Sequence, residues 1–189
     1  MAGRVEHSGG RRWTGWRIAG WSVAALLLLL PLVAMQFTDE VNWDGTDFIV
    51  MGGLIGGIGL GMELLVRKSD SLAYRLGAAV ALAAAFLIVW INLAVGMIGS
   101  EDNLLNLLFG GVLAVGLIGA IVARFEPAGM ARAMVAAAVA QGVAGAVGLS
   151  TDVRGAVLSM AFAGLWLLAA ALFRKAAREQ APAGAGLAG

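Results

Sequence analysis

Apolar residues fall in six long runs along the chain, separated by short polar segments. A helix needs about 20 apolar residues to cross the hydrocarbon layer of a membrane, because each backbone N–H and C=O must be paired within its own segment. The pattern therefore predicts an all-α fold, a polytopic transmembrane bundle of six helices. The predicted spans are residues 16–37, 47–66, 76–98, 104–123, 133–149 and 155–173. They form one transmembrane domain, residues 16–173, between a polar tail (1–15) and a C-terminal tail (174–189).

Two of the spans leave questions open. The fifth contains Gln141 and many Ala and Gly, so we expect it to insert only alongside its neighbours. The first has the basic start and apolar run of a secretory signal peptide. However, Pro31 interrupts that run and no small-x-small cleavage site follows it, so we interpret the first span as an anchor.

A topology of six helices places nearly all basic residues on one side of the membrane. Of the 13 lysines and arginines, all but Arg154 fall in the tails and loops that this count places on one side of the membrane. Lys and Arg gather in cytoplasmic segments of membrane proteins. We therefore expect both termini in the cytoplasm of a bacterial cell and the chain in its inner (plasma) membrane. The opposite face is acidic.

Composition excludes most familiar classes of enzyme. The chain is 60% hydrophobic and only 13% charged, too few charges to cover a soluble domain. It has no Cys and one His, His7, which removes thiolate nucleophiles, Ser-His triads and His or Cys metal sites. We expect no catalytic residue, metal, cofactor or nucleic acid, and the lipid bilayer as the first partner.

Glycines concentrate in the second span with small-xxx-small spacing, which lets another helix approach closely. The alternative is a helix that flexes or lines a pore. Packing is the interpretation we prefer, and Gly116, Gly119 and Gly148 suggest further tight contacts in the fourth and fifth spans. The glycines predicted to pack are Gly52, Gly53, Gly56, Gly57, Gly61, Gly142 and Gly145.

Three polar side chains lie within predicted spans. Glu63 precedes Arg67 by four residues, the favourable order for a helical ion pair, and the alternative is an intramembrane proton or cation site. Asn92 and Gln141 are expected to hydrogen-bond to neighbouring helices.

The predicted outer loops hold the densest polar cluster of the chain. Much of it is expected to cap helices, but six carboxylates on two loops exceed what capping needs. Such a cluster could collect a hard cation or offer an acidic docking face to a basic partner. The residues singled out are Asp44, Asp47, Glu101, Asp102, Asn103 and Asn106, together with Asn92.

Three strings resemble a family of small uncharacterised bacterial multi-pass membrane proteins. They run from Pro31 to Trp43 (PLVAMQFTDEVNW), from Asn92 to Asn103 (NLAVGMIGSEDN) and from Ala123 to Arg132 (ARFEPAGMAR). The resemblance implies a helical protein of the inner membrane and no particular activity. Leu104 stands where such proteins often have Pro, which implies a different start for the fourth helix.

These observations favour a non-catalytic membrane protein, a helical packing or accessory unit that associates with itself or with a larger complex. The alternative is a small transporter or channel for an ion or small solute. A transport pathway usually needs ionisable groups near the midplane of the membrane, whereas Glu63 lies near the end of its span.

Overall fold

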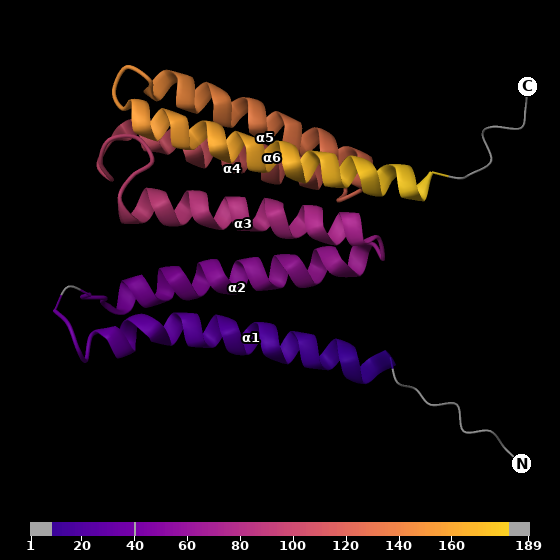
Figure 1. The fold of residues 1–189 in the computed structure, drawn as a ribbon, viewed down its shortest axis with the longest axis horizontal. Helices are drawn as coiled ribbons and strands as arrows, with labels where there is room; N and C mark the ends of the chain where they lie inside the picture. The colour runs from indigo at the N-terminus through magenta and orange to yellow at the C-terminus, as the bar shows by residue number, and fades with distance from the viewer. Residues whose placement is uncertain (1–8, 40, 182–189) are drawn as a thin grey trace, which may run out of the picture. The chain divides into compact units, whose positions relative to one another are not determined.

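The computed structural model describes residues 9–39 and 41–181. Every regular element in these residues is a helix, and six α-helices are long and apolar enough to cross a membrane, which confirms the predicted all-α, six-span fold (Figure 1). The elements are Gly9–Ala34 (α1), Gly45–Lys68 (α2), Leu72–Ala94 (α3), the single 3-10 turn Leu104–Asn106 (η1), Leu107–Val122 (α4), Pro127–Gly148 (α5) and Val153–Gln180 (α6).

The chain divides into two compact units, residues 1–60 and 61–189. The first unit holds α1 and the first part of α2. The second holds the end of α2 and the four helices α3 to α6, and we call this second unit the four-helix unit. Each unit is described by itself below.

α5 is the most buried helix of the four-helix unit. It packs against both α4 and α6, and α6 also packs against α3 (Figure 1). Half of the most apolar stretch of α5 is buried, the largest share of any of the six spans. Because its residues face other helices more than lipid, α5 needs little hydrophobicity of its own, which accounts for the weak apolar signal of the fifth span.

Small residues bring α4 and α5 into close contact. A Cβ atom built on Gly119 would lie 2.7 Å from the Cβ of Ala133, and one built on Gly116 would lie 3.7 Å from the Cβ of Ala137. The glycines of α4 thus stand opposite alanines of α5, with no room for a larger side chain at Gly119. The tight contact expected at Gly119 is present, whereas the contact at Gly116 is an ordinary van der Waals contact.

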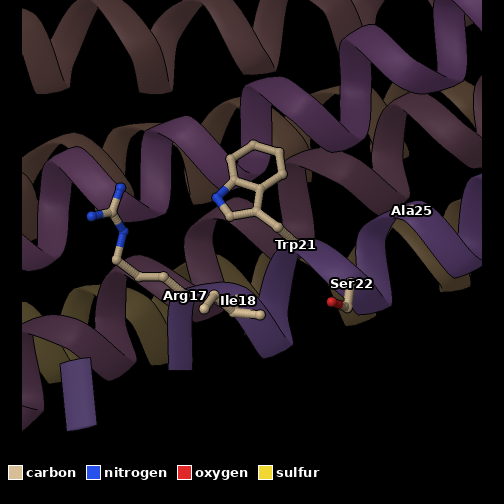
Figure 2. A pocket seen from close by; sticks show the side chains of 5 residues that line it. All are labelled: Arg17, Ile18, Trp21, Ser22 and Ala25. Atoms are coloured by element: carbon tan, nitrogen blue, oxygen red, sulfur yellow. The ribbon is translucent and has the colours of Figure 1, made fainter. Parts of the chain in front are cut away.

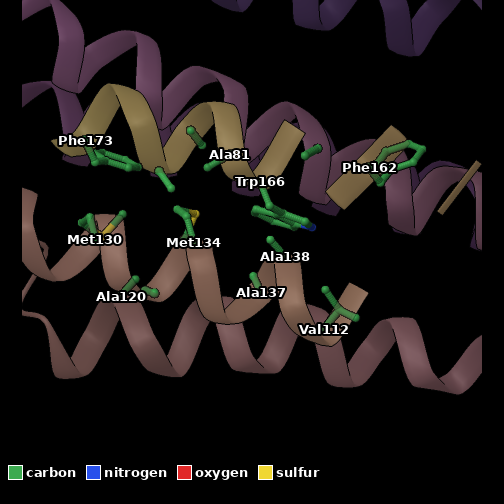
Figure 3. Close-up of a cluster of buried hydrophobic side chains, with 14 of the residues drawn as sticks. Ala81, Val112, Ala120, Met130, Met134, Ala137, Ala138, Phe162, Trp166 and Phe173 are labelled. Atoms are coloured by element: carbon green, nitrogen blue, oxygen red, sulfur yellow. The ribbon is translucent and has the colours of Figure 1, made fainter. Parts of the chain in front are cut away.

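Larger side chains fill the space between α6 and its neighbours. Trp166 and Phe173 of α6 are buried, and Met134 of α5 lies on the side of its helix that faces them (Figure 3). Tyr74 of α3 packs edge-on against Phe173 with 5.1 Å between ring centroids. Gly77, one turn further along α3, leaves space for the same ring. The core is therefore built from aromatic residues of α6 and small residues of α3 and α5.

Several helix boundaries differ from the predicted spans. α3 ends at Ala94 and not at residue 98, because Gly96 turns the chain away. α5 begins at Pro127 and not at residue 133, since proline suits the first turn of a helix, where its missing N–H is not needed. Residues 9–15 and 174–180, predicted as tails, are helical; the remaining tail residues 1–8 and 182–189 lie outside the described residues.

The end of α6 is held by the α2–α3 connection. The Ser71 hydroxyl donates to Glu179 at 2.7 Å, and the Gln180 amide donates to the Ser69 hydroxyl at 2.9 Å. Ser71 also caps α3 by accepting from the Tyr74 N–H. These bonds between segments far apart in sequence explain why the helix continues past the apolar span.

A matched pair of glycines in α5 tests the packing. A Cβ at Gly145 would lie 2.9 Å from both Cβ and Oγ of Ser159, whereas Gly142 has no such neighbour within 4 Å. We expect Gly145→Ala to lower the free energy of unfolding by about 1 to 3 kcal/mol, as overpacking does. Gly142→Ala should leave it unchanged or raise it by up to about 1 kcal/mol, because alanine is the better helix former.

Unfolding of both variants in the same detergent micelles measures the difference. Equal destabilisation by the two substitutions would contradict the close α5–α6 contact at Gly145.

Candidate functional site

The polar loop, residues 95–103, joins α3 to η1 and contains three residues of the predicted outer cluster, Glu101, Asp102 and Asn103. Gly96 and Gly99 both have positive φ, +76° and +72°, a backbone region that favours glycine. A Cβ at Gly96 would also collide with the carbonyl of Ser100. Both glycines are therefore required by the tight path of this loop.

The side chain of Asn106 holds the polar loop together. Its Oδ1 accepts from the backbone N–H groups of Met97 at 3.0 Å and Ile98 at 2.9 Å. Its Nδ2 donates to the carbonyl oxygen of Ser100 at 2.7 Å. The side-chain amide of Asn106 thus pairs with three backbone groups that make no helical hydrogen bond. Asn106 was predicted for a binding cluster, and in the structure it stabilises the loop.

Met97 and Ile98 close the end of the four-helix unit. Both are buried, although they belong to the loop and not to a helix. The Ile98 side chain fills the place that a Cβ on Gly148 of α5 would take, and the Met97 carbonyl lies against Gly155 of α6. The loop is consequently an apolar plug with a polar outer surface.

Asp152 ties the polar loop to the start of α6. One carboxylate oxygen accepts from the Gly99 N–H at 3.0 Å, and the other accepts from the Arg154 N–H at 2.9 Å as the N-cap of α6. The backbone hydrogen bonds from Gly99 and Gly155 hold the pKa of Asp152 below its ordinary value of 3.8. This carboxylate was not among the residues singled out from the sequence.

The other members of the predicted cluster have separate roles. Asn103 accepts from the Leu105 N–H at 3.0 Å and so caps η1. Glu101 and Asp102 are exposed at the tip of the polar loop. η1 precedes α4, so the fourth helix begins with a 3-10 turn at Leu104.

Asp44 and Asp47 form a reciprocal cap at the start of α2. Asp44 Oδ1 accepts from the N–H groups of Thr46 at 2.7 Å and Asp47 at 3.1 Å, and Asp47 Oδ2 accepts from the Asp44 N–H at 2.9 Å. Trp43 and Phe48 flank this capping box in edge-on contact at 5.3 Å between ring centroids, as a hydrophobic staple does. Capping accounts for both carboxylates.

The described residues contain no group of three or more His, Cys, Asp or Glu side chains placed to hold a metal ion. Asp44 and Asp47 belong to the first unit, while Glu101 and Asp102 belong to the second. Asp44, Asp47, Asn103 and Asn106 thus pair backbone groups at helix ends and in the polar loop.

The polar residues within the spans differ from one another. Glu63 lies 3.6 Å from Arg67, the expected ion pair. Gln141 is fully buried and bonds α6 as expected: it donates to Ser159 at 3.0 Å and accepts from Trp166 at 3.4 Å. Asn92 does not bond a neighbouring helix through its amide group as predicted, since its Nδ2 donates to the Ile88 carbonyl of its own helix at 2.7 Å.

The Oδ1 atom of Asn92 is buried without a hydrogen-bond partner among the described residues. Asn92 follows Ile88 by one helical turn on α3, and Ile88 is itself buried in the core. Such an orphaned acceptor costs free energy in an apolar environment.

The glycines predicted to pack have unequal surroundings. Gly145 meets Ser159, Gly52 lies 3.6 Å from Leu28, and Gly61 lies 3.4 Å from Leu82, measured from the ideal Cβ position in each case. The other four have no atom of another segment within 4 Å of that position. They are Gly53, Gly56, Gly57 and Gly142.

Sequence reasoning expected a tight contact at Gly148, which Ile98 makes, but it missed the other residues that hold the polar loop in place: Gly96, Ile98, Asp152 and Gly155. The signal that was available is the pattern Gly96-Met97-Ile98-Gly99, in which two glycines flank two apolar residues outside any helix. Their partners lie some 50 residues away on α5 and α6, a distance along the chain that periodicity does not reveal.

Comparison of the chain with protein-family models, curated proteins and solved structures gave no significant match.

Two asparagines provide a test of these assignments. Asn106→Leu should lower the free energy of unfolding by about 2 kcal/mol or more, because the N–H groups of Met97 and Ile98 lose their partner and the Ser100 carbonyl keeps only the Asn103 N–H. Asn92→Leu should be neutral or stabilising by up to about 1 kcal/mol, since it replaces an orphaned acceptor with an apolar group of similar size. Denaturation in one detergent compares the two variants with the native chain, and a large loss from Asn92→Leu would show that its Oδ1 does have a partner.

Asp152 predicts a pH dependence of stability. Because its pKa is lowered in the folded chain, the carboxylate stabilises the fold above its ordinary pKa of 3.8, and this contribution is lost as the pH falls through the lower folded value. Melting curves between pH 3 and pH 7 should therefore show a steeper decline at acid pH for the native chain than for Asp152→Asn. Parallel curves for the two proteins would refute the role of this carboxylate.

Proposed function

We propose that this integral membrane protein is a non-catalytic packing or accessory unit that acts by association, with a second copy of itself or with a larger complex, through the glycine face of α2. The observation that carries the proposal is the exposure of Gly53 and Gly57, one turn apart on α2, with no atom of another segment within 4 Å of either ideal Cβ position.

Exposed glycines are costly in a helix that faces lipid. Each interior glycine lowers helix stability by roughly 0.5 to 1 kcal/mol relative to alanine, and lipid gains nothing from its small size. A second helix does gain, because two backbones approach closely where side chains are missing. Large apolar residues continue the exposed face on both sides of the glycines: Ile49, Val50, Leu60 and Leu64.

The first unit buries few residues between its own two helices. In the most apolar stretch of α1 only Pro31 is buried, and about a tenth of the corresponding stretch of α2 is buried (11%). α5 and α6, by contrast, have much of their surface covered within the four-helix unit. The proposal places the association surface in the unit whose own helices cover each other least.

The proposed location is the bacterial inner membrane, with both termini in the cytoplasm. The support is the distribution of Lys and Arg, of which Arg154 alone falls on the opposite side in a six-helix topology.

A small transporter or channel is the competing function, and one observation favours it. The buried Oδ1 of Asn92 has no partner in the described residues, and polar groups held within a span often serve a pathway. Solute flux in proteoliposomes that disappears in Asn92→Leu would favour transport over association. Glu63 gives less support, because it pairs with Arg67 near the end of α2.

Co-purification of two differently tagged copies from one membrane tests self-association. The double substitution Gly53→Leu with Gly57→Leu should reduce recovery of the second tag by about tenfold or more, the effect of losing roughly 1.4 kcal/mol of association free energy. Gly164→Leu is the matched control: this glycine of α6 is also exposed and open, but Met160 and Leu168 flank it one turn away on each side.

Equal recovery from the native chain and the α2 variant would reject the glycine face as the contact. Recovery of a monomer alone from the native chain in mild detergent would reject self-association altogether.

A further inference from the structure

One face of α1 carries a hollow of about 490 Å³, lined by Arg17, Ile18, Trp21, Ser22 and Ala25 (Figure 2). These residues occupy consecutive turns of a single helix. The small side chains of Ser22 and Ala25 follow the larger ones of Ile18 and Trp21, which leaves the depression. All five residues are exposed.

Trp21 forms a fixed wall of this hollow. Its indole ring packs against Gly59 of α2, with ring carbons 3.0 to 3.4 Å from the ideal Cβ position of that glycine. The missing side chain at Gly59 therefore leaves room for the ring. Trp21 as a whole still exposes 39% of its surface. Figure 2 shows the Arg17 guanidinium and the Trp21 indole extending to the same side of α1.

The hollow lies where the apolar span begins. Arg17 is the first residue of the membrane-spanning stretch Arg17–Ala34, and Ala25 lies about 12 Å deeper at the helical rise of 1.5 Å per residue. Polarity falls along this path, from a guanidinium, through an indole N–H and a hydroxyl, to a methyl group. A phospholipid has the same order of groups, from phosphate through ester carbonyls to acyl chain.

Charge near the hollow favours a lipid with a net negative headgroup. Arg17 carries a positive charge at one end of the hollow, and α1 contains no acidic residue between Gly9 and Ala34. Arginine binds phosphate through paired N–H donors, and tryptophan favours the boundary between headgroups and hydrocarbon.

We propose that this hollow binds an anionic phospholipid, with its phosphate at Arg17 and one acyl chain running along Ile18 and Trp21 toward Ala25. The site lies on α1 and is independent of the glycine face of α2, so either can fail without the other.

Native mass spectrometry of the full chain, with phosphatidylglycerol or phosphatidylcholine of identical acyl chains, tests the site. The native chain should retain phosphatidylglycerol about fivefold better, the preference expected when one basic residue faces an anionic headgroup. Arg17→Gln should abolish this preference. Arg174→Gln, which removes an exposed arginine near the end of α6, is the matched control and should keep it.

Ala25→Trp fills the hollow without changing charge and should reduce retention of both lipids, with thermal melting confirming that each variant is folded. Equal loss of preference in Arg17→Gln and Arg174→Gln would overturn the proposal in favour of general attraction to basic residues. Displacement of the lipid by millimolar inorganic phosphate would overturn it in favour of a simple anion site, and equal retention of both lipids by the native chain would overturn it outright.

Discussion

Pairing of backbone polar groups at the ends of the membrane-spanning helices is the constraint on which this structure depends. Within hydrocarbon a helix satisfies its own N–H and C=O groups, but a turn between two helices does not. At the α3–α4 turn Asn106 supplies the missing partners, and at the start of α2 Asp44 and Asp47 do so. Asp152 and Asn103 pair backbone N–H groups in the same way at the starts of α6 and η1.

Close approach of helices is the second constraint, and it fixes the place of α5. Gly145 lets Ser159 of α6 come near, and Gln141, one turn earlier, then bonds that serine in both directions, with its amide as donor and its backbone carbonyl as acceptor. Trp166 adds a third bond to the same glutamine. α5 has few large side chains that could fix its position along α6 by packing. This buried hydrogen-bond network therefore sets the register of α5 relative to α6.

The sequence predicted the number and order of the helices because span length and hydropathy are local properties. It failed at Met97 and Ile98, which are as apolar as the span before them but turn inward as a plug. Spacing alone did not distinguish Gly53 from Gly145: both have glycine or alanine neighbours at helical spacing, yet one faces open space and the other a serine of α6. Such differences depend on which helix lies opposite, and that is decided by tertiary contacts rather than by local pattern.

The two units differ in what they leave for other molecules. The four-helix unit uses Asn106, Gln141 and Gly145 internally, to pair backbone groups, to bond α6 and to let α6 approach. The first unit has an arginine and a tryptophan beside a hollow and two exposed glycines on α2, features suited to a lipid or to a partner helix. The four-helix unit buries a core of its own, whereas within the first unit few residues of α1 and α2 are buried. Binding of a lipid or of a second helix by the first unit is therefore the function that its residues favour.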